Sequence, residues 1–141
     1  MDPPAKVEVV DTIPKMSAGS AVCPTARVTD GTLVLAFSLP SCDDSAVIRF
    51  DGVLTWSYGY PNDEGLGSHP LWGHGIELYE FHVSPIGPDG TRWCIATFHD
   101  GTLTVNSKTV QVLAEKLPLK PWEAIDAVVG PGENRVLDYE Y

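Results

Sequence analysis

The chain has 141 residues, of which 43% are hydrophobic, and its 19 acidic and 9 basic side chains give a formal net charge of −10. This length and composition are typical of a globular protein, so we predict a single β-rich domain over residues 1–141. The negative charge repels phosphate groups, which argues against nucleic acids and anionic membranes as partners and favours a basic protein or a metal cation.

Glycine and proline are frequent, with 13 and 12 copies, and they favour turns over long helices. The sequence therefore predicts a mainly-β fold, either an antiparallel sandwich or a barrel, with one short C-terminal helix. Residues 1–31 are interrupted by prolines and are predicted to be a loosely ordered lead-in, with a short edge strand within residues 7–10. The strand signal begins at Thr32, and residues 33–39 form an apolar run typical of a strand covered on both faces.

Two Asp-Gly pairs predict hairpins, because both residue types tolerate the positive φ that a tight turn needs. Asp51-Gly52 is expected to connect strands over residues 46–50 and 53–58. Asp100-Gly101 is expected to connect a buried strand over residues 92–99 to the strand that starts at residue 102.

Residues 59–75 are rich in glycine but also carry ordering side chains, which is typical of a packed loop rather than a mobile one. The following residues 76–83 alternate in polarity and predict a strand. Residues 109–113 could form a strand or begin a short helix. Residues 121–129 predict a helix, since Pro121 suits its first position and Gly130 its end.

The cysteines Cys23, Cys42 and Cys94 are odd in number and have no metal-binding spacing, which favours a reducing compartment. Cys94 lies in an apolar run and is interpreted as a small buried hydrophobe. The first residues lack the basic start and apolar stretch of a signal peptide, and the longest strongly apolar segment is too short to span a bilayer. We therefore predict a cytoplasmic protein.

One loop carries metal-ligand residue types close together in the sequence, namely Asp63, Glu64, His69 and His74. No helix or strand period aims these side chains at one point. The simpler interpretation is that Asp63 and Asn62 cap backbone N–H groups in turns while the histidines make hydrogen bonds within the loop.

Two further histidines, His82 and His99, could join this loop at one end of a sheet and complete a three-His or 2-His-1-carboxylate site for Zn, Mn or Fe. His99 beside Asp100 is more simply a turn device than a catalytic pair. No G-x-S-x-G motif, activated cysteine or phosphate-binding glycine loop is present, so no catalytic residue is assigned.

The middle of the chain is rich in aromatic residues, and Trp72 is the one most readily expected to face a partner, because it lies in a loop. The candidate binding residues are Asp63, Glu64, His69, Trp72 and His74.

Residues 46–113 resemble a group of small bacterial proteins of unassigned function. The resemblance lies in the order of four motifs: PNDE at residues 61–64, HPL at residues 69–71 followed by Gly75, an aromatic strand at residues 79–83, and TFHD at residues 97–100. It implies a single-domain cytoplasmic protein and no particular activity.

We expect a non-catalytic interaction protein that neutralises or escorts a basic protein, in the manner of small acidic immunity proteins. A metal-binding protein or metal-dependent enzyme is one alternative, and a β-barrel that holds a small molecule inside it is another. The sequence indicates no oligomeric state.

Overall fold

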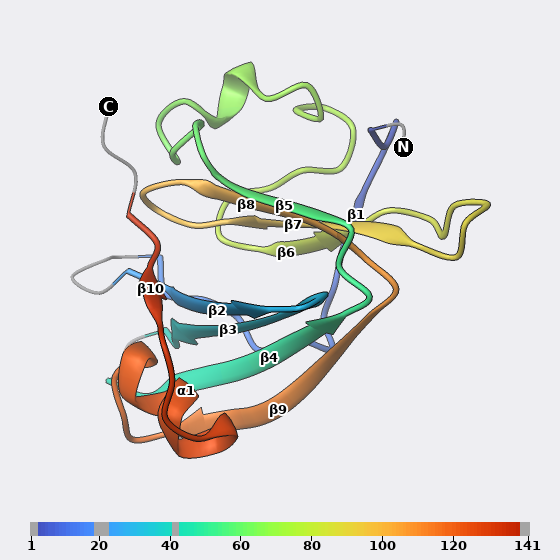
Figure 1. The fold of residues 1–141 in the computed structure, drawn as a ribbon. Helices are drawn as coiled ribbons and strands as arrows, with labels where there is room; N and C mark the ends of the chain where they lie inside the picture. The colour runs from blue at the N-terminus through green and yellow to red at the C-terminus, as the bar shows by residue number, and fades with distance from the viewer. Residues whose placement is uncertain (1–2, 19–22, 41–42, 139–141) are drawn as a thin grey trace.

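The structure is a computed structural model, and it describes residues 3–18, 23–40 and 43–138. Two antiparallel sheets of five strands lie in two layers (Figure 1), so the mainly-β prediction is confirmed as a sandwich. Sheet A has the order β1 (Glu8–Val9), β6 (Phe81–Val83), β7 (Arg92–Thr97), β8 (Thr102–Ser107) and β5 (Thr55–Gly59). Sheet B has the order β10 (Arg135–Val136), β2 (Thr25–Thr29), β3 (Thr32–Ser38), β4 (Ser45–Asp51) and β9 (Thr109–Leu117).

The main core lies between the two sheets and is built by the inward side chains of alternate strand residues. Phe81 packs between Phe37 and Phe98, with ring centroids 5.0 and 6.0 Å away. Cys94 belongs to this core, as its apolar neighbours predict, and burial raises the pKa of its thiol to about 12. Residues 93, 95 and 97 of β7 therefore face the other way, to the outside of sheet A.

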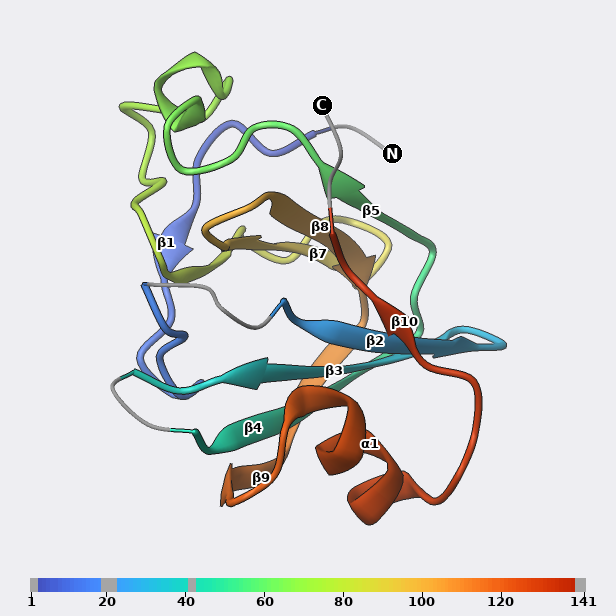
Figure 2. The same ribbon diagram turned by 90° about the vertical axis from the view of Figure 1, so that its left-hand side faces the viewer.

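Each sheet is also covered on its outer face. The helix α1 (Pro121–Val129) covers sheet B, where Ala124 and Ile125 pack on Ala36 and Val47. The connection between β5 and β6, residues 60–80, covers sheet A, where Leu66 and the other members of a small apolar cluster pack around Ile95. Figure 2 shows these two covers on opposite sides of the sandwich. We call residues 60–80 the platform.

The helix prediction is confirmed to the residue, and its local signals act as expected. Pro121 occupies the first turn, the Glu123 carboxylate accepts the backbone N–H of Lys120 at 3.1 Å, and Gly130 ends the helix with φ 88°. Arg27 of β2 ties the helix to the sheet by donating to Asp126 at 2.6 Å and to the Gly130 carbonyl at 2.8 Å. In the described part of the chain no helix is both long and apolar enough to cross a membrane.

The hairpin predicted at Asp51-Gly52 is wrong. Gly52 does take positive φ (64°), but the chain passes there from β4 in sheet B to β5 in sheet A. Both edges of β4 are already paired, with β3 and β9, so no edge remains for β5. The two-residue hairpin of the structure lies instead at Asp30-Gly31 between β2 and β3, with φ 29° and 79°.

The other strand predictions have mixed outcomes. The hairpin at Asp100-Gly101 is confirmed, since Thr97 pairs with Thr102 across it, and residues 109–117 are a strand rather than a helix. The strand predicted over residues 76–83 is too long, because only Phe81–Val83 pairs with neighbours. Tyr79, with φ 56°, breaks the extended run before β6.

The loosely ordered lead-in predicted for residues 1–31 is wrong over much of its length. The short edge strand is confirmed as β1, but Val7, Ile13 and Met16 are buried and β2 pairs along its full length with β3. Prolines fragment the secondary structure here without preventing apolar side chains from packing. Cys42 lies outside the described residues.

Candidate functional site

The platform is folded by its own side chains, as the loop prediction required. The Asn62 carboxamide oxygen accepts the N–H of Gly65 at 2.9 Å, and His69 Nδ1 accepts the N–H of Leu71 at 3.0 Å. A 3-10 turn, η1 (Leu66–Ser68), directs Leu66 into the small apolar cluster. Ser68 Oγ donates to the Gly65 carbonyl at 2.8 Å and so accepts the Tyr60 hydroxyl at 2.7 Å. Gly-rich sequence here produces a chain of turns that are each closed by a hydrogen bond.

Three side chains fasten the platform to the β7–β8 hairpin. Asp63 Oδ2 accepts hydrogen bonds from the Tyr79 hydroxyl at 2.6 Å and from His99 Nδ1 at 2.7 Å. The backbone N–H of Asp63 donates to the His99 carbonyl at 3.1 Å, so the two residues are joined twice. We call Asp63, Tyr79 and His99 the brace.

The brace has a defined protonation pattern. Burial opposes ionisation of Asp63, but the hydrogen bonds from Tyr79 and His99 outweigh it and leave the pKa of this carboxyl below its ordinary value. The same carboxylate raises the pKa of Tyr79 to about 12, because the neutral phenol donates a hydrogen bond to it. Asp63 is thus held as an acceptor and Tyr79 as a donor at neutral pH.

Among the described residues, those next to the brace do not form a nucleophilic site. Cys23 Sγ lies 3.7 Å from Asp100, and the pKa of the thiol is raised by burial and by that carboxylate, which is the opposite of thiol activation. His99 Nε2 lies 3.7 Å from Asp100 Oδ1, and its Nδ1 is bound by Asp63. The imidazole is therefore occupied in joining two loops of sheet A.

The four histidines do not gather as the metal-site alternative requires. His82 is fully buried, and its Nε2 accepts the Glu77 N–H at 2.8 Å while Nδ1–H donates to the Ile95 carbonyl at 2.9 Å. Burial lowers the pKa of His82 and of His69, which keeps both neutral. His74 is exposed, and His99 belongs to the brace. Over the described ranges no three His, Cys, Asp or Glu side chains come together as a metal site.

The predicted binding residues divide into two groups. Asp63 and His69 make the internal bonds described above, whereas Glu64, Trp72 and His74 are exposed on the platform. The exposed surface of the platform also includes Tyr60, which belongs to the aromatic-rich middle of the chain, and Leu78, which sequence reasoning missed. Their exposure could have been suspected only from their positions next to Pro61 and Tyr79. The chain turns at these places, so a large side chain there does not have to point into the core.

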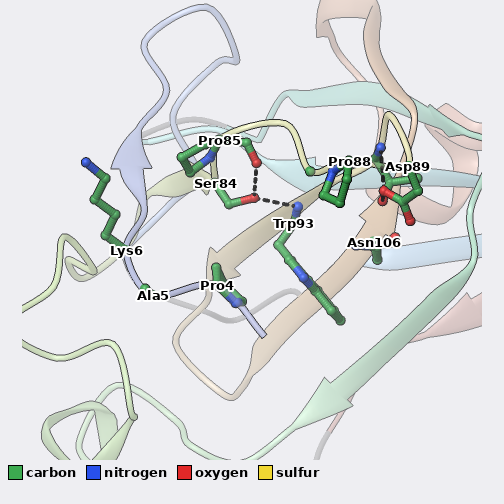
Figure 3. Close-up of a pocket in the computed structure, with 11 residues that line it drawn as sticks. Pro4, Ala5, Lys6, Ser84, Pro85, Pro88, Asp89, Trp93 and Asn106 are labelled. Carbon is green, nitrogen blue, oxygen red and sulfur yellow. Dashed lines mark hydrogen bonds between the residues drawn. The ribbon is translucent and has the colours of Figure 1, made fainter. Parts of the chain in front are cut away.

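A second candidate site lies on the same outer face of sheet A, next to the N-terminal segment. The described strands form two sheets with an apolar core between them. A cavity of ≈ 470 Å³ lies outside the sandwich instead, lined by Pro4, Lys6, Asp89, Trp93 and Asn106 among others (Figure 3). The signal in the sequence was the alternation along β7 and β8, which turns Trp93 and Asn106 outward.

Comparison with known proteins finds no matching family model, no matching curated protein and no matching solved structure.

Proposed function

We propose that the protein is a non-catalytic interaction module that binds a basic protein through the platform, in the manner of small acidic immunity proteins. The observation that carries this proposal is the exposure of large side chains in the platform, which also carries the exposed carboxylates of Glu64 and Glu77. Tyr60 is 58% exposed, Trp72 49% and Leu78 41%. Aromatic anchors of this kind dominate the binding energy of many protein interfaces.

Charge supports a basic partner in particular. Residues 50–91 contain no lysine and no arginine. Lys15 pairs with Glu80 of the platform at 2.7 Å, whereas the exposed carboxylates of Glu64 and Glu77 make no ion pair among the described residues. The whole molecule adds a formal charge of −10. Such a field steers a cationic protein toward the surface and raises its association rate at low ionic strength.

The brace supports a binding role over a catalytic one. Its polar atoms are used to hold the platform on β7 and β8, and a rigid surface loses less conformational entropy when a partner binds. The ionisable groups of the brace therefore hold the platform in its folded shape. The exposed side chains of Tyr60, Trp72 and Leu78 provide the contact area for a partner.

The experiment is affinity capture from a soluble cell extract with matched pairs of bait variants. We expect the unaltered protein to retain a basic protein at about 50 mM salt and to release it near 500 mM, because salt screens the attraction. Trp72→Ala should weaken retention by at least about 10-fold. Glu64→Gln with Glu77→Gln should reduce the salt dependence.

The control variants lie on sheet B and on the helix that covers it. Trp122 of α1 is 44% exposed, much like Trp72, and Glu115 of β9 is an exposed carboxylate. Trp122→Ala and Glu115→Gln should leave retention unchanged. The proposal fails if no basic protein is retained at low salt, or if Trp72→Ala and Trp122→Ala weaken retention equally.

A further inference from the structure

The cavity of ≈ 470 Å³ is separate from the platform and has a defined construction. Trp93 and Asn106 form its floor on adjacent strands, where they pair in register. The N-terminal segment with Pro4 forms one wall, and the loop between β6 and β7 with Asp89 forms the other (Figure 3). Volumes of this size are typical of small-molecule sites.

The loop wall is held in place by hydrogen bonds. Ser84 Oγ accepts the Trp93 N–H at 2.9 Å and donates to the Pro85 carbonyl at 3.0 Å. Asp89 Oδ1 accepts the N–H of Thr91 at 3.1 Å and its hydroxyl at 2.7 Å, and these bonds lower the pKa of Asp89. The carboxylate is thus ionised and fixed through one oxygen, which leaves Oδ2 for a ligand.

Asn106 supplies an acceptor that the protein does not use. The residue is only 2% exposed, and its Oδ1 has no hydrogen-bond partner among the described residues. Buried polar atoms are seldom left in this state, because an unpaired one destabilises the fold. Asn106 lines the cavity, and a half-turn of its amide exchanges the oxygen and the NH2 group, so the oxygen can be presented to a ligand while Nδ2 takes its place.

Asp89, Asn106 and Trp93 can all interact with the same kind of chemical group. A carboxylate and an amide oxygen accept N–H donors, and an indole face attracts a planar cation. Lys6 also lines the cavity, but its side chain extends away from Trp93 and Asp89 (Figure 3). A guanidinium group meets all three requirements, since it is planar, cationic and rich in N–H donors.

We propose that this cavity binds a guanidinium group, with the planar cation stacked on Trp93 and its N–H donors shared between Asp89 and Asn106. The group can belong to a free small molecule or to an arginine side chain. The site is independent of the platform, and its occupancy does not require the proposed protein partner.

The test is a titration of the ¹⁵N-labelled protein followed by NMR, with butylguanidinium as the probe and butylurea as its uncharged counterpart. We expect butylguanidinium to shift the Trp93 indole and Asn106 amide signals with saturation at a Kd on the order of 1 mM, as for a ligand of this size. Butylurea should bind at least about 10-fold more weakly. Capped arginine, N-acetyl-argininamide, distinguishes the two sources by binding more tightly than butylguanidinium if side chains are the natural ligand.

Matched variants separate binding from folding. Asp89→Asn keeps an acceptor for Thr91 but removes the charge, and it should weaken butylguanidinium at least about 10-fold, whereas Glu115→Gln on the opposite sheet should not. Asn106→Leu should weaken binding while raising Tm, because it removes a buried unpaired acceptor. Equal binding of butylguanidinium and butylurea, binding of methyl glucoside instead, or no shift with any probe would overturn the proposal.

Discussion

At the scale of single residues, the platform depends on one carboxylate oxygen. Tyr79 and His99 both donate to Asp63 Oδ2, at 2.6 and 2.7 Å, and the carboxylate is mostly shielded from solvent. Hydrogen bonds to an ionised acceptor are stronger than neutral ones. The brace therefore holds the platform against β7 and β8.

Tyr79→Phe tests the brace through its dependence on pH. The pKa of Tyr79 is raised to about 12 in the folded protein against an ordinary value of 10.0, so the unfolded chain loses this proton first. The stability that the bond contributes is thus complete below pH 10 and is lost as the pH rises from 10 to 12. The variant should lose about 1 kcal/mol at neutral pH and show a flatter fall of Tm in that window. Thermal melts of both proteins from pH 7 to 12 provide the check, and parallel profiles above pH 10 would contradict the brace.

Residue contacts of this kind were beyond sequence reasoning. Asp63 was placed in a loop and His99 at the end of a strand, but they are 36 positions apart and meet only because the platform folds back over β7. His82 shows the converse. Its strand position and residue type allowed a ligand role, yet burial and two backbone partners make it a neutral structural residue.

At the scale of elements, the platform and the first strand approach each other at a glycine. Gly75 has φ 107°, and a Cβ placed there would collide with the carbonyl oxygen of Val7. The N–H of Val7 donates to the His74 carbonyl at 3.1 Å, so the two segments are in direct backbone contact. This contact joins β1 to the platform.

Gly75→Ala should therefore be severely destabilising, by about 3 kcal/mol or more, because it adds both strain and a backbone collision. Gly67 is the matched control in the same segment, since a Cβ added there would meet no atom within 4 Å and its φ is not positive. Gly67→Ala should change stability by less than about 0.5 kcal/mol. Urea unfolding of both variants measures the difference, and equal losses would show that the platform is not packed on the N-terminal segment.

Two of the Asp-Gly pairs, at 30–31 and 51–52, show how far local signals reach, and only the second of them was used to predict a hairpin. Both glycines take positive φ, so the dipeptide correctly marks a turn at each place. Only the first joins neighbouring strands, because the pairing of β4 with β3 and β9 is decided by contacts far along the chain. The helix α1 was predictable to the residue, since its ends are set by Pro121 and Gly130 themselves.

At the scale of the whole molecule, the sandwich has two differently covered faces. A helix covers sheet B, and the platform covers sheet A (Figure 2). The mainly-β class followed from composition and apolar runs, whereas the choice of two layers depends on chain crossings that no local pattern encodes. Both proposed sites lie on the outer face of sheet A, so their independence has to be shown by variants that affect one and leave the other.

The binding surface exists only if the platform is folded, and hydrogen exchange measures this directly. The amides of Gly65, Ser68, His69, Leu71, Trp72 and His74 are hydrogen-bonded. We predict that they exchange at least about 100-fold more slowly than an unstructured peptide, which corresponds to an opening free energy of about 3 kcal/mol. Exchange of residues 60–80 at the rates of an unstructured peptide, while the two sheets stay protected, would contradict a folded platform. The proposed binding surface would then be lost.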